Sequence, residues 1–304
     1  MNAYRAPWWL PGGHLQTIFA ALAPTPRVAF RRERWDTPDG DFIDLDWAGD
    51  DNTGPLLALF HGLEGSSGSH YSRSLAAQAL AAGWRCVVPH FRGCSGELNR
   101  LPRAYHSGDS AELDWILRRL DTRYAVGVSL GGNALLKLLG EKGTGIGLRR
   151  AAAVSAPLVL AAAGRSLDQG LNRELYTRIF LKTLKKKTFE KIRLQKIRID
   201  AVRLEKARTF WEFDDAVTAP LHGFLGADDY WARSSSAPWL PSIRIPTLVL
   251  NARNDPFMPA SALDGIAPVP PNVVLEFPRS GGHAGFPGRD HWLARRVLEF
   301  LSAP

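Results

Sequence analysis

Cysteine is scarce in this chain of 304 residues, which contains only Cys86 and Cys94. Two cysteines provide neither a disulfide framework nor the spacing of a zinc site, so a disulfide-stabilised secreted domain and a structural zinc module are excluded. This cysteine usage is typical of a reducing compartment. Cys86 lies in an apolar run, where we expect a core residue and not a reactive thiol.

Long hydrophobic runs are missing as well. No run reaches the ~18 apolar residues that a membrane-spanning helix needs. The N-terminus carries no secretory signal, because Pro7, Pro11 and Gly12-Gly13 interrupt it and the apolar run 18–23 is short. We therefore expect a cytoplasmic protein.

The composition is that of a globular enzyme. Hydrophobic residues make up 45% of the chain and charged residues 22%, which allows a large core and excludes disorder. The length exceeds the ~150 residues of a typical domain, but single α/β domains of about 250 residues or more are common. We expect residues 1–304 to form a single domain.

The net charge of +8 is concentrated in one segment, Lys182–Arg208, which holds eleven Lys or Arg residues against three acidic ones. The segment lacks the interleaved aromatic residues that stack on bases and matches no nucleic-acid-binding module, so no nucleic acid is expected as a partner. Two interpretations stay open. The segment is either a solvated helical face or a site of peripheral contact with anionic lipid at the inner membrane surface.

Eight short runs along the chain predict strands. Asp39-Gly40 lies between the first two, and this dipeptide between alternating runs predicts an antiparallel hairpin. The other six runs are almost continuously apolar, as is typical of parallel strands buried on both faces. The expected strands cover residues 28–35, 42–47, 56–60, 84–89, 124–128, 151–155, 247–250 and 273–277.

Helical patterns at residues 72–82, 110–120, 133–139 and 292–301 alternate with these strands. Such alternation predicts a parallel sheet with right-handed crossovers. A hairpin followed by six parallel strands describes the α/β-hydrolase fold, with eight strands in a mostly parallel sheet. Residues 158–240 separate the sixth strand from the seventh and are too many for a simple crossover, so we predict an inserted helical cap there.

The stretch Gly127-Val128-Ser129-Leu130-Gly131 has the pattern Gly-x-Ser-x-Gly. The apolar run before it suits a strand, and residues 132–139 suit a helix that ends at Gly140. A strand that turns at once into a helix bends sharply, and the glycines relieve the crowding because they lack Cβ. We therefore predict that Ser129 is a nucleophile held over the start of a helix.

A serine nucleophile needs a base, and the base needs an acid that orients it. In this fold the order along the chain is Ser, Asp, His. Asp255 follows the seventh strand and His283 lies in the loop after the eighth, which is where the topology requires an acid and a base. Asp264 competes for the role of the acid, and His106 and His291 are weaker candidates for the base.

Negative charge that develops on a carbonyl oxygen needs hydrogen-bond donors, each worth about 3 kcal/mol of barrier. We expect the backbone N–H of Leu130, directly after the nucleophile, to be one donor. The second is the N–H of Leu63, in the loop after the third strand. Glu64 is unexpected at this place, because a carboxylate would oppose the charge. We expect its side chain to point away and bond to backbone.

Motifs along nearly the whole chain resemble the YheT-type branch of the α/β-hydrolase superfamily. This branch includes eukaryotic ABHD-type lipid hydrolases and yeast medium-chain acyltransferase/esterases. The resemblance implies carboxylic ester hydrolysis with Ser129, Asp255 and His283 as the catalytic triad. The matching motifs are Gly13-His14-Leu15-Gln16-Thr17, His61-Gly62-Leu63-Glu64-Gly65, Phe91-Arg92-Gly93-Cys94-Ser95-Gly96, Tyr105-His106-Ser107-Gly108-Asp109, Gly127-Val128-Ser129-Leu130-Gly131-Gly132-Asn133, Thr218-Ala219-Pro220-Leu221-His222-Gly223-Phe224, Asn254-Asp255-Pro256-Phe257 and Gly281-Gly282-His283.

We therefore expect a carboxylesterase that works through an acyl-enzyme on Ser129, with no cofactor and no metal. Its substrate would be a small-molecule or lipid-like ester of a short- to medium-chain acid. An acyltransferase with the same triad, passing the acyl group to an alcohol, is the alternative. A binding protein with an idle triad is disfavoured by the intact residue set. Five cap aromatics either line the acyl site or pin the cap to the sheet: Trp211, Phe213, Phe224, Tyr230 and Trp231.

Overall fold

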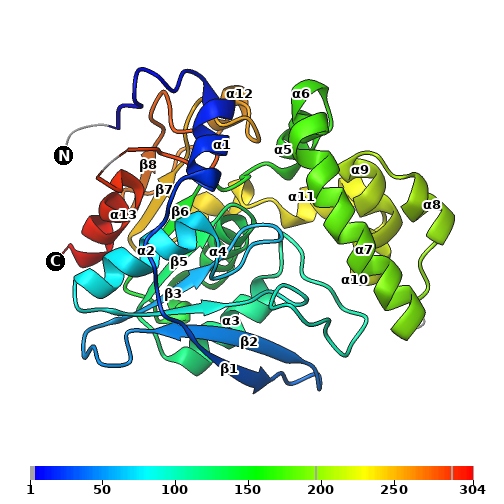
Figure 1. The fold of residues 1–304 in the computed structure, drawn as a ribbon, viewed down its shortest axis with the longest axis horizontal. Coiled ribbons are helices and arrows are strands. Elements are labelled where there is room, and N and C mark those ends of the chain that lie inside the picture. The colour runs from blue at the N-terminus through cyan, green and yellow to red at the C-terminus, as the bar shows by residue number, and fades with distance from the viewer. Residues whose placement is uncertain (1–3, 196, 289, 304) are drawn as a thin grey trace.

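The computed structural model describes residues 4–195, 197–288 and 290–303. The eight predicted strands form one sheet, in the order β1-β2-β4-β3-β5-β6-β7-β8 (Figure 1). β1 and β2 form the predicted antiparallel hairpin, β2 pairs antiparallel with β4, and the other neighbours are parallel. The strands are β1 (Arg31–Asp36), β2 (Phe42–Ala48), β3 (Leu56–Phe60), β4 (Arg85–Pro89), β5 (Tyr124–Val128), β6 (Arg150–Val154), β7 (Thr247–Leu250) and β8 (Val273–Glu276).

Helices cover both faces of the sheet. α2 (His70–Ala81) and α13 (Trp292–Ser302) pack on one face, and α3 (Ser110–Leu120) and α4 (Leu130–Lys142) pack on the other. Strand β3 shows the reason, because its alternate side chains enter opposite cores: Leu57 and Leu59 on the α2 side, Ala58 and Phe60 on the α4 side. A run that is apolar throughout therefore suits this position.

Two predicted bounds of α4 are wrong. The helix begins at Leu130, directly after Ser129, and not at residue 133. It also passes through Gly140 and ends at Lys142, with Gly143 at φ 54° as its C-cap. Gly140 is a packing residue: a Cβ there would lie 2.5 Å from the carbonyl oxygen of Trp239.

The segment between β6 and β7 is helical, as predicted, and we call residues 158–240 the cap. Figure 1 shows the cap helices grouped at one side of the sheet. They enclose small cores of their own, around Leu181 and Phe213 and around Phe210 and Trp231. The division of the chain into domains stays a prediction. The elements of this segment are α5 (Leu160–Leu167), α6 (Gly170–Asn172), the π-helical η2 (Arg173–Thr177), α7 (Arg178–Gln195), α8 (Ala201–Lys206), α9 (Phe210–Phe213), the π-helical η3 (Asp214–Thr218), α10 (Ala219–His222), α11 (Ala227–Ser234) and the 3₁₀ turn η4 (Ala237–Ser242).

Three further helical elements were not predicted: α1 (Gly13–Leu22), the 3₁₀ turn η1 (Gly143–Ile146) and α12 (Ala260–Asp264). Helix α1 escapes a pattern search because its burial is reversed. Its buried residues are Gln16, Thr17 and Ala20, whereas Leu15 and Leu22 are exposed. Within the described ranges, no helix is both long and apolar enough to cross a membrane.

Candidate active site

Ser129 stands at the turn between β5 and α4. Its backbone adopts φ 53° and ψ −120°, a conformation that typically costs a non-glycine residue about 1–3 kcal/mol. Two backbone hydrogen bonds hold it: Ser129 N–H donates to the Val154 carbonyl at 2.8 Å, and Asn133 N–H donates to the Ser129 carbonyl at 3.0 Å. The turn thereby keeps the hydroxyl at the carboxyl edge of the sheet.

The loop after β3 packs tightly against this turn. A Cβ on Gly131 would lie 2.6 Å from the carbonyl oxygens of both Phe60 and His61, and a Cβ on Gly62 would lie 3.0 Å from Cβ of Ser129. Only a glycine at position 131 therefore allows the loop to approach so closely. At position 62, glycine gives the least crowded contact with Ser129. The approach brings the loop that contains Leu63 beside the serine.

A hydrogen-bonded chain connects Ser129, His283 and Asp255. The Ser129 hydroxyl lies 2.9 Å from Nε2 of His283, and Nδ1 of His283 lies 2.9 Å from Oδ2 and 3.2 Å from Oδ1 of Asp255. The Asp255 side chain is completely buried and the His283 ring is 12% exposed. With Nδ1–H donating to the carboxylate, Nε2 is the nitrogen that can accept the serine proton.

The His283 loop is fixed by residues that sequence reasoning did not assign to the site. Thr17 Oγ1 accepts a hydrogen bond from His283 N–H at 2.8 Å, and Ser155 Oγ accepts one from Ala284 N–H at 2.9 Å. The ring of Phe257 stacks on the imidazole with centroids 4.0 Å apart. Thr17 and Phe257 lie within motifs that carry the family resemblance. That resemblance was the one sequence signal that could have assigned them to the site.

Helix α1 is fastened to the same region by polar contacts. Gln16 Oε1 accepts hydrogen bonds from Gly281 N–H at 2.8 Å and from the Asn254 amide at 3.0 Å. Asn254 Oδ1 in turn accepts from Gly282 N–H at 3.1 Å. The buried polar side of α1 therefore supports both the loop that carries Asp255 and the loop that carries His283.

The competing candidates do not contact Ser129 or His283. Asp264 forms a surface ion pair of 2.8 Å with Arg253, and its side chain is 58% exposed. His291 is exposed at the start of α13. His106 packs against His222 of the cap, with ring centroids 4.5 Å apart. The structure thus brings Asp255 and His283, and none of these three side chains, to Ser129.

The β3 loop is organised by a buried histidine. His61 Nε2 accepts from Phe91 N–H at 3.1 Å, and Nδ1 lies 2.7 Å from the Gly62 carbonyl. Burial lowers the pKa of His61 to about 3, so the ring is neutral and can donate at Nδ1 while accepting at Nε2. His61 therefore has a structural role in this loop. Leu63 and Leu130 both border the cavity above Ser129.

The expectation for Glu64 is wrong. Its carboxylate bonds to side chains and not to backbone: it accepts from the Tyr105 hydroxyl at 2.9 Å and from Lys187 Nζ at 2.8 Å. Lys187 belongs to α7 of the cap. Its positive charge offsets the carboxylate that the sequence placed beside the predicted oxyanion donors.

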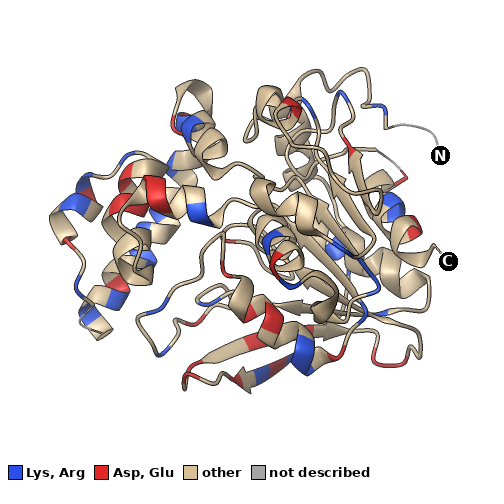
Figure 2. Ribbon diagram, turned by 180° about the vertical axis from the view of Figure 1, so that it is seen from behind, with Lys and Arg blue, Asp and Glu red and all other residues tan. Residues whose placement is uncertain are grey.

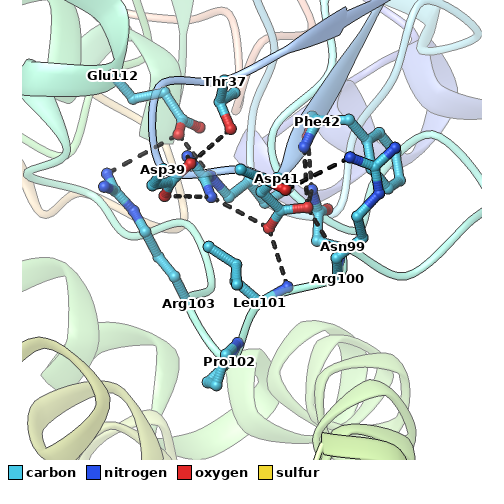
Figure 3. Close-up of polar contacts among 12 residues, drawn as sticks. Thr37, Asp39, Asp41, Phe42, Asn99, Arg100, Leu101, Pro102, Arg103 and Glu112 are labelled. Carbon is cyan, nitrogen blue, oxygen red and sulfur yellow. Dashed lines mark hydrogen bonds and ion pairs between the residues drawn. The ribbon is translucent and has the colours of Figure 1, made fainter.

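A second lysine of α7 holds the loop between β4 and α3. Lys191 Nζ donates to the carbonyls of residues 101, 102 and 103 at 2.9, 3.2 and 2.7 Å. From the other side, Asp41 accepts from the N–H groups of Arg100 and Leu101 at 2.9 and 3.2 Å (Figure 3). Burial lowers the pKa of Lys191 to about 8. The loop is therefore clamped between the β1–β2 hairpin and the cap.

The basic segment Lys182–Arg208 is only partly available to solvent. Lys187 and Lys191 make the contacts just described, and Lys185 donates to backbone carbonyls, at 2.9 Å to that of Glu205. Lys182 and Lys186 are exposed, whereas Lys196 lies outside the described residues. Figure 2 shows red acidic positions among blue basic positions along the ribbon of the cap.

A cavity of about 580 Å³ lies between the sheet and the cap, with Ser129 and His283 in its wall. Most of the lining is apolar. Of the five cap aromatics singled out in the sequence, Phe213, Tyr230 and Trp231 line the cavity and are also buried in the cap. The other two do not line it: Trp211 is 39% exposed, and the Phe224 ring packs against Tyr230.

Comparison with known proteins agrees with this architecture. Residues 55–290 match the family model described as alpha/beta hydrolase fold. YheT of Escherichia coli (strain K12), an esterase by name, is 38% identical over 95% of this chain and 90% of its own length. The human phospholipase ABHD3 is 32% identical over 97% of this chain and 77% of its own length.

The chain belongs to the α/β-hydrolase family. Among solved structures, an esterase from Exiguobacterium antarcticum superposes with a TM-score of 0.61 at 14% identity, covering 90% of this chain and all of that one, which bears on the fold alone. The predicted fold class and the resemblance to the YheT-type branch are both confirmed. This α/β-hydrolase is an ester hydrolase.

Proposed function

We propose that this hydrolase cleaves carboxylic esters through an acyl-enzyme on Ser129. The Ser129 oxygen attacks the ester carbonyl carbon while Nε2 of His283 takes the hydroxyl proton. Asp255 stabilises the imidazolium, which then protonates the departing alcohol, and water repeats the sequence to release the acid. The continuous hydrogen-bonded chain from Ser129 to Asp255, at the wall of a cavity, is the observation that carries this proposal.

We further propose the backbone N–H groups of Leu63 and Leu130 as the oxyanion donors. Leu130 is the first residue of α4, and the first N–H groups of a helix lack intrahelical acceptors. The N–H groups on either side of Leu63 are already engaged: Gly62 N–H donates to the Tyr71 hydroxyl at 2.8 Å and Glu64 N–H to the Tyr105 hydroxyl at 2.9 Å. These contacts fix the loop around Leu63.

The proposed substrate is a lipid-like ester of a short- to medium-chain acid. The cavity volume lies within the ~300–1,000 Å³ of small-ligand pockets, and its apolar walls suit an acyl chain. The names of the relatives, an esterase and a phospholipase, support a lipid-like ester.

A series of chromogenic esters of increasing acyl length tests this proposal on the purified protein. We expect kcat/KM to rise with the first added methylenes and then to fall once the chain outgrows the cavity. Ser129→Ala supplies the background rate. A rate that is independent of chain length would contradict the assignment of the cavity to the acyl group. Product analysis with an added alcohol separates hydrolysis from acyl transfer.

We also propose that the exposed cations of Lys182–Arg208 favour binding of the protein to anionic membranes. Each Lys or Arg near such a surface can contribute about 1 kcal/mol, which salt screens. Since Lys187 is bonded to Glu64, the informative variant is Lys182→Gln with Lys186→Gln. Low-salt binding to anionic vesicles should weaken in this variant, and unchanged binding would assign the segment to a solvated face.

A further inference from the structure

Helix α1 presents its apolar residues to solvent and its polar residues to the protein. A surface helix of a globular protein normally has the opposite arrangement. Here Gln16 and Thr17 are buried against the His283 loop, while Leu15 is 49% and Leu22 80% exposed. Hydrogen bonds hold the inner face in place, whereas Leu15 and Leu22 of the outer face remain exposed.

The segment before α1 extends this apolar surface. Trp8 is 91% exposed and Trp9 is 51% exposed, and the Trp9 ring contacts the Phe19 ring edge-on with centroids 5.1 Å apart. The segment is nevertheless held in place, because Leu10 is buried and its carbonyl accepts from the Gln16 amide at 2.8 Å. Exposed tryptophans on a fixed segment are typical of surfaces that meet an apolar phase beside water.

The apolar surface is continuous with the rim of the catalytic cavity. Ile18 and Leu22 of α1 line the cavity, and so does Ile179 of α7, which is 64% exposed. The two sides of the rim meet where His14 Nδ1 lies 3.1 Å from the Tyr176 hydroxyl. In Figure 1, α1 and the cap helices α5 and α6 all lie along the upper part of the molecule.

Basic residues flank this surface, although the exposed Glu174 lies beside the rim residue Tyr176. The chain contains no acidic residue before Glu33, whereas Arg5 and Arg27 in that stretch are exposed. On α7, Arg178 and Lys182 are exposed beside Ile179. An apolar face with tryptophans and flanking cations fits a lipid–water interface. Anionic lipid headgroups would repel such a face less than they would repel a face with an acidic rim.

We propose that the apolar face of α1, together with Trp8, Trp9 and Ile179, docks this protein on a lipid surface. Docking would set the cavity rim against the lipid layer, so that an acyl chain enters the cavity without crossing water. Burial of each methylene is favourable, so avoiding that crossing matters most for the longer of the acyl chains that the cavity accepts. The inference concerns binding alone and depends on no catalytic step.

Vesicle cosedimentation of the full chain tests the proposal, with phosphatidylcholine vesicles and with vesicles that also contain phosphatidylglycerol. The test variant is Trp8→Ser with Leu15→Ser, because neither side chain lines the cavity. The matched control is Leu225→Ser, which replaces a cap side chain that is 96% exposed and does not line the cavity. Thermal unfolding of each variant reports whether it folds.

We expect the wild type and Leu225→Ser to bind both kinds of vesicle, with binding to phosphatidylcholine persisting at high salt. The double variant should bind at least about tenfold more weakly, because two large apolar side chains no longer enter the lipid. Its turnover on a small soluble ester should equal that of the wild type.

Three results would overturn the proposal. The first is equal binding by the double variant and the wild type. The second is binding to anionic vesicles alone that salt abolishes, which would assign the contact to the basic segment. The third is that neither protein binds vesicles, while the wild type elutes as a dimer and the double variant as a monomer. That result would assign the surface to contact with a second copy of the chain.

Discussion

The ammonium group of Lys187 lies 2.8 Å from the carboxylate of Glu64, and this ion pair joins the cap to the loop that contains Leu63. The Glu64 side chain is only 10% exposed. Without Lys187, the poorly solvated carboxylate of Glu64 would carry an unpaired negative charge beside the proposed oxyanion site. An unpaired charge in such a place is typically unfavourable. Lys187→Met should therefore lower kcat by on the order of tenfold, about the cost of one weakened charge interaction.

Two further variants make this prediction specific. Lys186→Met removes an exposed charge one residue away and should leave kcat unchanged. Adding Glu64→Gln to Lys187→Met removes the unpaired charge and should restore part of the lost rate. If Lys187→Met were as active as Lys186→Met, the ion pair would have no part in catalysis.

The acid of the proposed triad can be tested against its nearest competitor. Asp255→Asn should lower kcat by on the order of 10²–10⁴-fold, because an amide no longer holds the His283 tautomer that accepts the serine proton. Asp264→Asn should be almost silent, because Asp264 forms an exposed pair with Arg253. Steady-state kinetics of the two variants decide the matter, and the reverse ranking would move the acid to Asp264.

Stability should fall in mild acid because of buried histidines, among them His106 and His222. Burial lowers the pKa of His222 to about 3 and that of His106 to about 4, whereas an unfolded histidine titrates near 6.5. As the pH falls below about 6.5, the unfolded state takes up protons that the folded state does not, so folding stability decreases towards these folded-state pKa values. The Tm of the wild type should therefore drop from pH 7 to pH 5.

Between pH 7 and pH 5, the Tm of His222→Asn should fall less than the Tm of the wild type. The Tm of His291→Asn, which alters an exposed histidine, should fall as much as that of the wild type. Identical pH profiles for the wild type and His222→Asn would show that His222 is not a source of the acid sensitivity.

Gly140 offers a test of the packing between α4 and the turn at Trp239. A Cβ at this position would lie 2.5 Å from the Trp239 carbonyl oxygen, a backbone atom that cannot rotate away. Gly140→Ala should destabilise the fold by about 1–3 kcal/mol, despite the better helix propensity of alanine. Gly145→Ala meets open space and serves as the control. A Tm for Gly140→Ala at or above that of the wild type would contradict this packing.

The sheet was predictable because each central strand is a short apolar run between polar turns. The runs 124–128 and 247–250 coincide with β5 and β7. Asp255 and His283 could be singled out for a related reason. In parallel α/β sheets functional side chains follow the carboxyl ends of strands, so their order in the sequence indicates their place in space.

The remaining features depend on contacts that no local pattern encodes. Lys187 and Glu64 are 123 positions apart, and nothing in either segment indicates the other. Helix α1 has no apolar inner face, because its Gln16 and Thr17 hydrogen-bond to the loops of Asn254 and His283. The helix is therefore defined by its tertiary partners, and hydrophobic periodicity could not have found it.

The central claim is that Ser129 carries the acyl group. Its most direct test is labelling with a serine-reactive fluorophosphonate followed by intact-mass and peptide mass spectrometry. Ser155→Ala, which removes a supporting hydroxyl in the same site, should still be labelled. We predict one adduct per wild-type chain, located on Ser129, and none on Ser129→Ala, whose turnover should fall by about 10³-fold or more. An adduct on another residue, or a Ser129→Ala variant that keeps more than about a tenth of wild-type turnover, would contradict the account.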